Sequence, residues 1–242
     1  MPVNLPLSLS MFSPGTATSI LRANLINYWK LENTNWVDSH TNADTLTAIN
    51  SPTAVAGQVG NAAEFGATKA LRKTSYTRLD GKAQVTWMFF IKVTTATAWV
   101  APASQYDGNT TASDWSIDLR ASGLKLNLVV VDGSDWNRQI VTDSDVLTLN
   151  TIHHVRVQYD GAQGTNLDRA KFWVGGTEIT AKTATGTLPA TIKGTTVKPL
   201  EIGSSDNALY SVVGWIDEMG IWGANLTTAQ ADAHRLATDL PY

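Results

Sequence analysis

Paired carboxylates come first among the residues that could do chemistry, because two acidic side chains on one strand can cleave a glycosidic bond. Retaining glycosidases hold these carboxyl groups about 5 Å apart. Asp114 and Asp118 flank Trp115, but aspartates four residues apart on a strand are too distant for this geometry. We therefore predict no catalytic residue, and a glycan-cleaving enzyme is the least favoured function. No two of the five glutamates fall in one predicted strand: Glu32, Glu64, Glu178, Glu201 and Glu218.

A second acidic feature is the pair Asp217–Glu218, which interrupts the otherwise apolar stretch GWIDEMGIW. Side chains alternate along a strand, so the two carboxylates are expected to point to opposite faces. A buried charge without a partner is costly, so a carboxylate here needs either a cation or backbone N–H donors. His153 and His154 are adjacent, and by the same alternation they cannot share a metal ion.

Tryptophans are the third feature, because aromatic faces in sugar-binding sites cover the C–H surface of a sugar ring. The chain has nine tryptophans, and three of them lie in predicted loops or at loop edges, beside amide and charged side chains. The resulting candidate ligand-binding residues are Trp36, Trp99, Trp136, Asn137 and Arg138. The alternative is that such rings cover the ends of the fold, and this alternative is favoured for any single ring.

Arg156 is a further candidate, from the polar face of the predicted strand over residues 152–159. In this segment His154, Arg156 and Gln158 alternate with an apolar face, as in a sheet that has one side towards water. A solvated face is the favoured interpretation, and a shallow polar groove for a ligand is the alternative.

The candidate residues must be positioned by β-strands. The sequence predicts these strands as short runs rich in Val, Ile, Trp, Tyr and Thr that are separated by turn residues. The clearest cover residues 25–32, 84–93, 115–133, 137–142, 153–161, 170–180, 200–204 and 212–222. Strands at this spacing predict an all-β jelly-roll sandwich of two antiparallel sheets, with about ten to fourteen strands. After the last strand, Thr227 and Gln230 form a capping box, which predicts a short C-terminal helix over Thr228–Thr238.

Composition excludes some partners. The 242 residues carry a net charge of −3 without a basic tract, and there is no cysteine; nucleic-acid binding is therefore not expected. No apolar stretch reaches the length of a membrane span.

Prolines interrupt the first residues, so residues 1–23 are predicted to form an extended arm rather than a signal peptide. A single jelly-roll domain is predicted over residues 24–242.

Six segments in order resemble the laminin G-like, concanavalin A-like jelly-roll domain of the lectin/glucanase superfamily. They are LINYWKLENTNWVDSH, GQVGNAAEFG, TIHHVRVQYDG, KFWVGGTEI, LEIGS and GWIDEMGIWGANLTTAQ. In similar jelly rolls one Ca²⁺ ion often ties the end of the first strand to the last strand. The resemblance therefore implies a structural calcium site at Glu32 and Asp217, with Asp38 and Glu218 nearby.

The resemblance leaves the function open, because the family includes sugar-binding modules, adhesion domains, viral and phage proteins and purely structural modules. The leading hypothesis is a non-catalytic carbohydrate-binding or adhesion module for a cell-surface glycan, on the surface of a phage or virus particle. The alternative is a structural virion decoration or tail component without a glycan ligand. In either case the expected location is the virion or the extracellular space. The apolar edge formed by Leu5, Leu7 and Leu9 is expected to dock on its own sandwich, on a second copy or on another virion protein.

Overall fold

The computed structural model describes residues 19–96, 99–106, 115–120, 124–131, 138–193 and 198–242. The strands in these ranges are β1 (Leu25–Trp29), β2 (Thr47–Ile49), β3 (Thr53–Ala56), β4 (Asn61–Phe65), β5 (Ala70–Tyr76), β6 (Gln84–Thr95), β7 (Trp99–Gln105), β8 (Trp115–Arg120), β9 (Lys125–Val130), β10 (Gln139–Thr142), β11 (Ile152–Asp160), β12 (Ala170–Val174), β13 (Thr177–Ile179), β14 (Lys182–Thr185), β15 (Lys198–Ile202) and β16 (Val213–Trp222). A 3₁₀-helix spans Asn166–Arg169, and one α-helix, α1, spans Thr228–Arg235.

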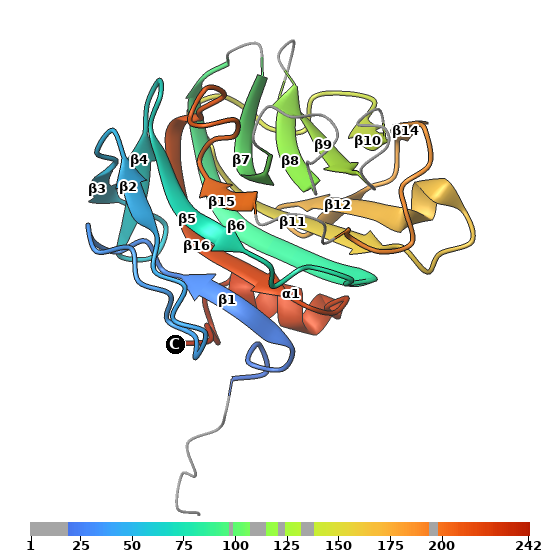
Figure 1. Cartoon of the computed structure of the whole chain (residues 1–242), viewed down its shortest axis with the longest axis horizontal. Coiled ribbons are helices and arrows are strands. Elements are labelled where there is room, and N and C mark those ends of the chain that lie inside the picture. Colours follow the sequence, from blue (N-terminus) through green and yellow to red (C-terminus); the bar gives the residue numbers. More distant parts are fainter. Residues whose placement is uncertain (1–18, 97–98, 107–114, 121–123, 132–137, 194–197) are drawn as a thin grey trace, which may run out of the picture.

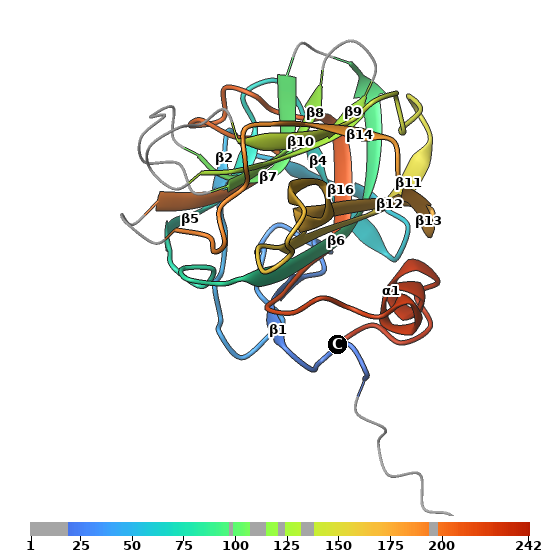
Figure 2. The same ribbon diagram turned by 90° about the vertical axis from the view of Figure 1, so that its right-hand side faces the viewer.

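The strands form two eight-stranded sheets, and every strand pair is antiparallel (Figure 1, Figure 2). The helix-side sheet has the order β13-β12-β11-β6-β16-β4-β3, with β1 also paired to β16. The pocket-side sheet has the order β14-β10-β9-β8-β7-β15-β5-β2. In both views α1 lies on the far side of the helix-side sheet from β7, β8 and β9. The predicted jelly-roll sandwich with a short C-terminal helix is confirmed.

The core lies between the sheets because apolar side chains alternate along the strands. In β8 the side chains of Trp115, Ile117 and Leu119 belong to the core and are at most 1% exposed. The indole of Trp115 meets that of Trp87 from β6, with 5.0 Å between ring centroids, so large aromatic side chains join the two sheets. Residues on the other face of β8, such as Asp118, are left to form sites outside this core.

Helix α1 begins at the predicted capping box. The Thr227 hydroxyl oxygen accepts a hydrogen bond from the Gln230 backbone N–H at 3.3 Å, and the Gln230 side-chain oxygen accepts one from the Thr227 N–H at 3.0 Å. The helix ends at Arg235, three residues before the predicted end. Ala237 adopts a φ of 52°, a left-handed conformation that cannot continue an α-helix.

The helical spacing of Ala229, Ala233, Leu236 and Ala237 predicts the packed face of α1, and the structure matches it only in part. Ala233 is buried, together with Ala231 and His234, whereas Leu236 is 56% exposed. Because the helix stops at Arg235, Leu236 no longer follows the helical spacing that would bring it to the sheet. In the described part of the chain, no helix is both long enough and apolar enough to span a bilayer.

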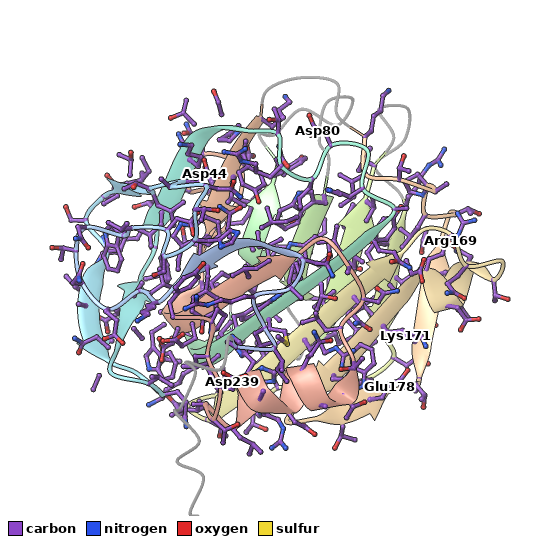
Figure 3. The ribbon with its side chains drawn as sticks, turned by 90° about the horizontal axis from the view of Figure 1, so that it is seen from below. Asp44, Asp80, Arg169, Lys171, Glu178 and Asp239 are labelled. Atoms are coloured by element: carbon purple, nitrogen blue, oxygen red, sulfur yellow. The ribbon has the colours of Figure 1, made fainter. Side chains whose placement is uncertain are left out.

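The polar face of β11 is not solvated, which corrects the favoured interpretation of its sequence. His154, Arg156 and Gln158 are 5–6% exposed because α1 and the segment before it cover this face (Figure 3). The Gln158 amide donates to the Leu226 carbonyl oxygen at 3.0 Å, and the Arg156 guanidinium donates to the same oxygen. Sequence periodicity identifies the polar face but not the element that covers it.

The described end of the predicted arm, residues 19–23, packs against the C-terminal part of the chain. Leu21 is fully buried, and its carbonyl oxygen accepts a hydrogen bond from Trp222 Nε1 at 2.7 Å. The Arg22 guanidinium donates to the Pro241 carbonyl oxygen at 2.7 Å. The apolar edge at residues 5–9 lies outside the described residues, so its docking and the domain boundary at residue 24 stay predictions.

Candidate functional site

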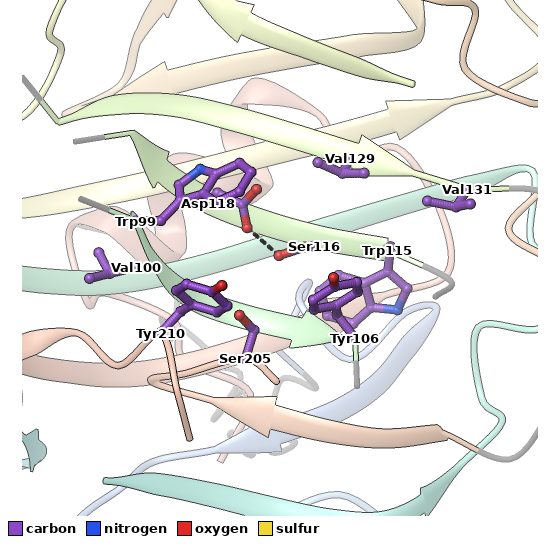
Figure 4. A pocket seen from close by; sticks show the side chains of 10 residues that line it. All are labelled: Trp99, Val100, Tyr106, Trp115, Ser116, Asp118, Val129, Val131, Ser205 and Tyr210. Carbon is purple, nitrogen blue, oxygen red and sulfur yellow. Dashed lines mark hydrogen bonds between the residues drawn. The ribbon is translucent and has the colours of Figure 1, made fainter. Parts of the chain in front are cut away.

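An aromatic pocket opens on the outer face of the pocket-side sheet (Figure 4). The empty space of about 570 Å³ in it includes open solvent, so the hollow is only partly enclosed. β7, β8 and β9 and the turn after β15 supply its lining. The lining residues are Trp99, Val100, Tyr106, Trp115, Ser116, Asp118, Val129, Val131, Ser205 and Tyr210.

The turn over residues 205–210 forms one side of the aromatic pocket. The Ala101 N–H donates to the Tyr210 carbonyl oxygen at 3.1 Å, which fixes the turn beside the beginning of β7. The Tyr210 ring then meets Trp99 edge to face, with 6.2 Å between centroids and an interplanar angle of 78°. A strand tryptophan and a turn tyrosine, far apart in the sequence, therefore form one wall.

Trp99 is the candidate tryptophan that the structure places in this pocket. The guanidinium of Arg120 lies over its indole, 4.4 Å from the ring centroid. The two residues are direct partners across the β7–β8 pair, where side chains on one face are close enough to touch. A cation over an indole face is worth about 0.5–2 kcal/mol, so the contact favours one orientation of the ring.

Asp118 is the one formally charged residue among those that line the pocket. It is 9% exposed and accepts hydrogen bonds from the Ser116 hydroxyl and, at 3.1 Å, from the Asn127 amide. Burial raises the pKa of the Asp118 carboxyl, while the Ser116 bond and the charge of Arg120 oppose the rise. The pocket therefore combines apolar walls with one strong hydrogen-bond acceptor.

The other predicted residues of the tryptophan platform do not gather at this pocket. Trp36 is 3% exposed and belongs to the hydrophobic core; this corrects its assignment as a ligand-binding residue, because a core ring cannot meet a sugar. Arg138 lies just before β10, where its guanidinium donates to the Thr187 carbonyl oxygen at 3.3 Å. Trp136 and Asn137 lie outside the described residues.

Arg156 lies on the other sheet, in a polar crevice between α1 and the β12–β13 hairpin. Its guanidinium carbon is 4.0 Å from the centroid of the Trp173 indole. Burial lowers the pKa of Arg156 to about 10, with Glu178 and Asp232 acting in the opposite direction. Since this crevice and the aromatic pocket are on different sheets, the structure does not bring Arg156 together with Trp99.

Two of the predicted calcium ligands meet at the turn between β3 and β4. Asp217 is fully buried, and its Oδ2 accepts hydrogen bonds from the Gln58 and Val59 backbone N–H groups, both at 2.9 Å. Glu32 Oε2 accepts one from the Asn61 N–H at 2.8 Å. The sequence led us to expect either a cation or backbone N–H donors as the partner of a carboxylate in this strand. Asp217 has the backbone N–H donors.

The other two predicted ligands have different partners. Asp38 accepts hydrogen bonds from the Asn27 amide at 2.7 Å and from the Tyr28 backbone N–H at 3.0 Å. Glu218 accepts one from the Tyr28 hydroxyl. Glu218 has a φ of 51° at an irregular position of β16, and it is 1% exposed. Both members of the acidic pair are therefore shielded from water.

One atom of Asp217 remains suited to a cation. Its Oδ1 is buried without a hydrogen-bond partner, and burial, with a contribution from the charge of Glu32, raises the pKa of Asp217 to about 7. Within the described residues, no three His, Cys, Asp or Glu side chains lie close enough to hold a metal ion. Glu32 and Asp217 would therefore need backbone or water oxygens to complete a calcium shell of six to eight ligands.

Two antiparallel sheets packed face to face, with a short C-terminal helix, define a jelly-roll domain. A family model described as the concanavalin A-like lectin/glucanases superfamily matches residues 65–231, more than half of the chain. The chain belongs to this superfamily, and the resemblance seen in its sequence is confirmed. A comparison with curated protein sequences gave no match.

Solved structures share the fold at low sequence identity. Domain 4 of AbnA, a GH43 extracellular arabinanase from Geobacillus stearothermophilus in complex with arabinotriose, has a TM-score of 0.65 and 16% identity, over 88% of this chain and 98% of that one. The receptor binding domain of botulinum neurotoxin C/D mosaic serotype has a TM-score of 0.66 and 11% identity, over 89% and 51%.

Trypanosoma rangeli sialidase in complex with sialic acid has a TM-score of 0.60 and 13% identity, over 90% of this chain and 34% of that one. The chain therefore spans about half of the toxin domain and about a third of the sialidase. At these identities the likeness shows the fold alone.

Proposed function

We propose that this chain is a non-catalytic carbohydrate-binding module that holds a sugar in the aromatic pocket. The observation that carries the proposal is the grouping of Trp99, Tyr106 and Tyr210 around a pocket that contains the acceptor Asp118. Aromatic rings cover the C–H faces of a sugar, and a convergent polar group orients its hydroxyls. The lectin-like family and the neighbour solved with arabinotriose support the proposal.

The chemistry of the pocket supports binding rather than cleavage. Glycoside hydrolysis uses two carboxyl groups that flank the scissile bond, whereas Asp118 is the one carboxylate that lines the described pocket. Asp118 is also only 9% exposed, so little of its carboxylate is open to a ligand. A sugar held on the aromatic wall would therefore be oriented by Asp118 without meeting the acid–nucleophile pair of a glycosidase.

The wider part of the proposal concerns the setting of the module. We infer display on a phage or virus particle or on another extracellular surface, with the apolar arm at residues 5–9 as the attachment. This part rests on the sequence of the arm, and removal of residues 1–18 tests it. The truncated protein should stay folded but lose self-association or particle attachment, and an unchanged mass and attachment would contradict this setting.

A glycan array, followed by titration of the bound sugars with tryptophan fluorescence as the readout, tests the binding proposal. Weak binding is expected, because the pocket is partly open to solvent and holds one sugar unit rather than a long chain. The fluorescence should respond to the sugar, since the partly exposed indole of Trp99 lines the pocket. The absence of any binding across a broad array, together with an unresponsive spectrum, would overturn the proposal.

A further inference from the structure

The aromatic pocket has an unequal lining. One edge is hydrocarbon surface, from Val129 in β9 and Val131 just after it, which are at most 8% exposed. A sugar hydroxyl placed against these side chains would lose its hydrogen bonds to water and gain none, which is unfavourable. A methyl group in the same place would gain from leaving water.

Asp118 is the charged acceptor in the polar part of the pocket, beside the hydroxyl groups of Tyr106, Ser205 and Tyr210. Each carboxylate oxygen of Asp118 accepts one hydrogen bond from the protein, Oδ1 from the Ser116 hydroxyl and Oδ2 from the Asn127 amide. An ionised carboxylate offers about four acceptor positions, so capacity remains for a ligand O–H or N–H. A ligand group that only accepts hydrogen bonds has no donor to meet at this residue.

The charges at the pocket disfavour an anionic ligand. Arg120 interacts with Asp118 electrostatically, but its guanidinium is stacked on Trp99 and donates to Gln139, and Arg120 is not among the lining residues. A ligand carboxylate would therefore approach the carboxylate of Asp118 without a lining cation to pair with. Like charges at short range in a desolvated site are unfavourable.

We propose that the aromatic pocket selects neutral sugars that carry a methyl group, namely N-acetylhexosamines or 6-deoxyhexoses, over plain hexoses and acidic sugars. The methyl group packs against Val129 and Val131, while a hydroxyl or the amide N–H donates to Asp118. This inference rests on the proposed function, because it takes the pocket as the sugar site.

Matched sugar pairs test the inference by titration calorimetry on the full chain. N-acetylglucosamine is compared with glucose, L-fucose with L-galactose, and 3′-sialyllactose with lactose. At least one methyl-bearing sugar should bind about fourfold more tightly than its partner, as expected for burial of one methyl group. The N-acetylglucosamine pair tests the acetyl methyl, and the L-fucose pair tests the methyl of a 6-deoxy sugar. Sialyllactose should bind no more tightly than lactose.

Two variants test the assigned contacts. Val129→Thr keeps the shape of the side chain but adds a hydroxyl, so it should remove the preference for the methyl-bearing sugar. Asp118→Asn removes the charge, so it should weaken the neutral sugar and raise the relative affinity of sialyllactose. Asp232→Asn, in α1, is the matched control and should change neither ratio. Thermal melts report whether each variant is folded. If Asp118→Asn does not fold, Val129→Thr alone tests the methyl contact.

The outcomes separate this inference from the proposed function. If neither methyl-bearing sugar is preferred over its partner, or if sialyllactose binds more tightly than lactose, and Trp99→Ala abolishes the binding that is seen, the selectivity is wrong while the pocket remains a sugar site. An unchanged methyl preference in Val129→Thr would also overturn the selectivity. If no sugar binds at all, the proposed function itself fails.

Discussion

The guanidinium of Arg120 and the indole of Trp99 form a stack, with 4.4 Å from the guanidinium carbon to the ring centroid. Arg120 also donates to the Gln139 side-chain oxygen on β10. One side chain thus connects the tryptophan of the pocket wall to the neighbouring strands, and Arg120 positions Trp99 without lining the pocket.

Arg120→Ala should weaken sugar binding by about three- to tenfold, because the loss of a cation–π contact leaves the indole free to adopt other rotamers. Arg120→Lys, which keeps the charge but not the planar stack, should fall between the wild type and Arg120→Ala. Arg156→Ala removes the equivalent stack on Trp173 and should leave the affinity unchanged. Equal affinities for Arg120→Ala and the wild type would show that Arg120 has no positioning role.

Two buried histidines hold α1 on its sheet through hydrogen bonds that require neutral rings. The ring nitrogens His154 Nε2 and His234 Nδ1 are 3.0 Å apart, and His234 Nε2 is 3.0 Å from the Glu218 carbonyl oxygen. Because a carbonyl only accepts, His234 Nε2 carries the proton and its Nδ1 accepts from His154. Protonation of His234 would therefore place two donors opposite each other.

Burial lowers the pKa of His234 to about 4 and that of His154 to about 2, and for His154 the charges of His234, Arg235 and Arg156 add to the effect. In the unfolded chain a histidine titrates near pH 6.5, so below that pH the unfolded state binds more protons and folding stability falls as pH falls. His234 alone should cost about 2 kcal/mol on going from pH 7.5 to pH 5.

Denaturant melts of the wild type and of His234→Asn, at pH 7.5 and pH 5, check this value. The acid-induced loss of unfolding free energy should be smaller in the variant by about 2 kcal/mol, because one titrating ring is gone. The buried carboxylates contribute equally to both proteins, so their contribution cancels when the change in unfolding free energy between the two pH values is compared. Parallel pH dependences would contradict the account of a buried neutral pair.

Calcium binding at Glu32 and Asp217 stays a proposal, supported by the buried Asp217 Oδ1 that has no hydrogen-bond partner. If Ca²⁺ binds there, EDTA should lower the melting temperature, since a ligand that binds only the native state stabilises it. Asp217→Asn should melt at a lower temperature and no longer respond to EDTA or to added Ca²⁺. A melting temperature that is the same with EDTA and with Ca²⁺ would count against the site.

The sequence could predict the fold because its strongest strands carry the alternation of the core. Segments such as 84–93 and 212–222 became β6 and β16, in the middle of the helix-side sheet. β7, at Trp99–Gln105, was missed, since WVAPASQ contains a proline and small residues rather than the β-branched residues that favour strands. β5, at Ala70–Tyr76, was missed because its polar residues conceal the alternation.

The pocket could be predicted only in part, for the same reason. Trp99 was identified by its aromatic ring at a loop edge. Tyr210 was not identified, because it meets Trp99 only after the pairing of β15 with β7 places the turn after β15 beside β7. Asp118 was considered as a partner of Asp114 for catalysis, yet it lines the pocket and is 9% exposed. Trp36 shows the converse: a loop-like sequence, NTNWVDSH, does not reveal that its ring belongs to the core.

Trp99 and Trp173 offer the most direct test of the central claim that the aromatic pocket is the sugar site. Both tryptophans are half-buried and both carry a stacked arginine, but they lie on different sheets. The measurement is the dissociation constant of the best array glycan for Trp99→Ala and for Trp173→Ala. The account predicts a loss of at least about tenfold for Trp99→Ala, as for a central aromatic contact, and a change of less than about twofold for Trp173→Ala. Unchanged binding by Trp99→Ala, or an equal loss in both variants, would contradict it.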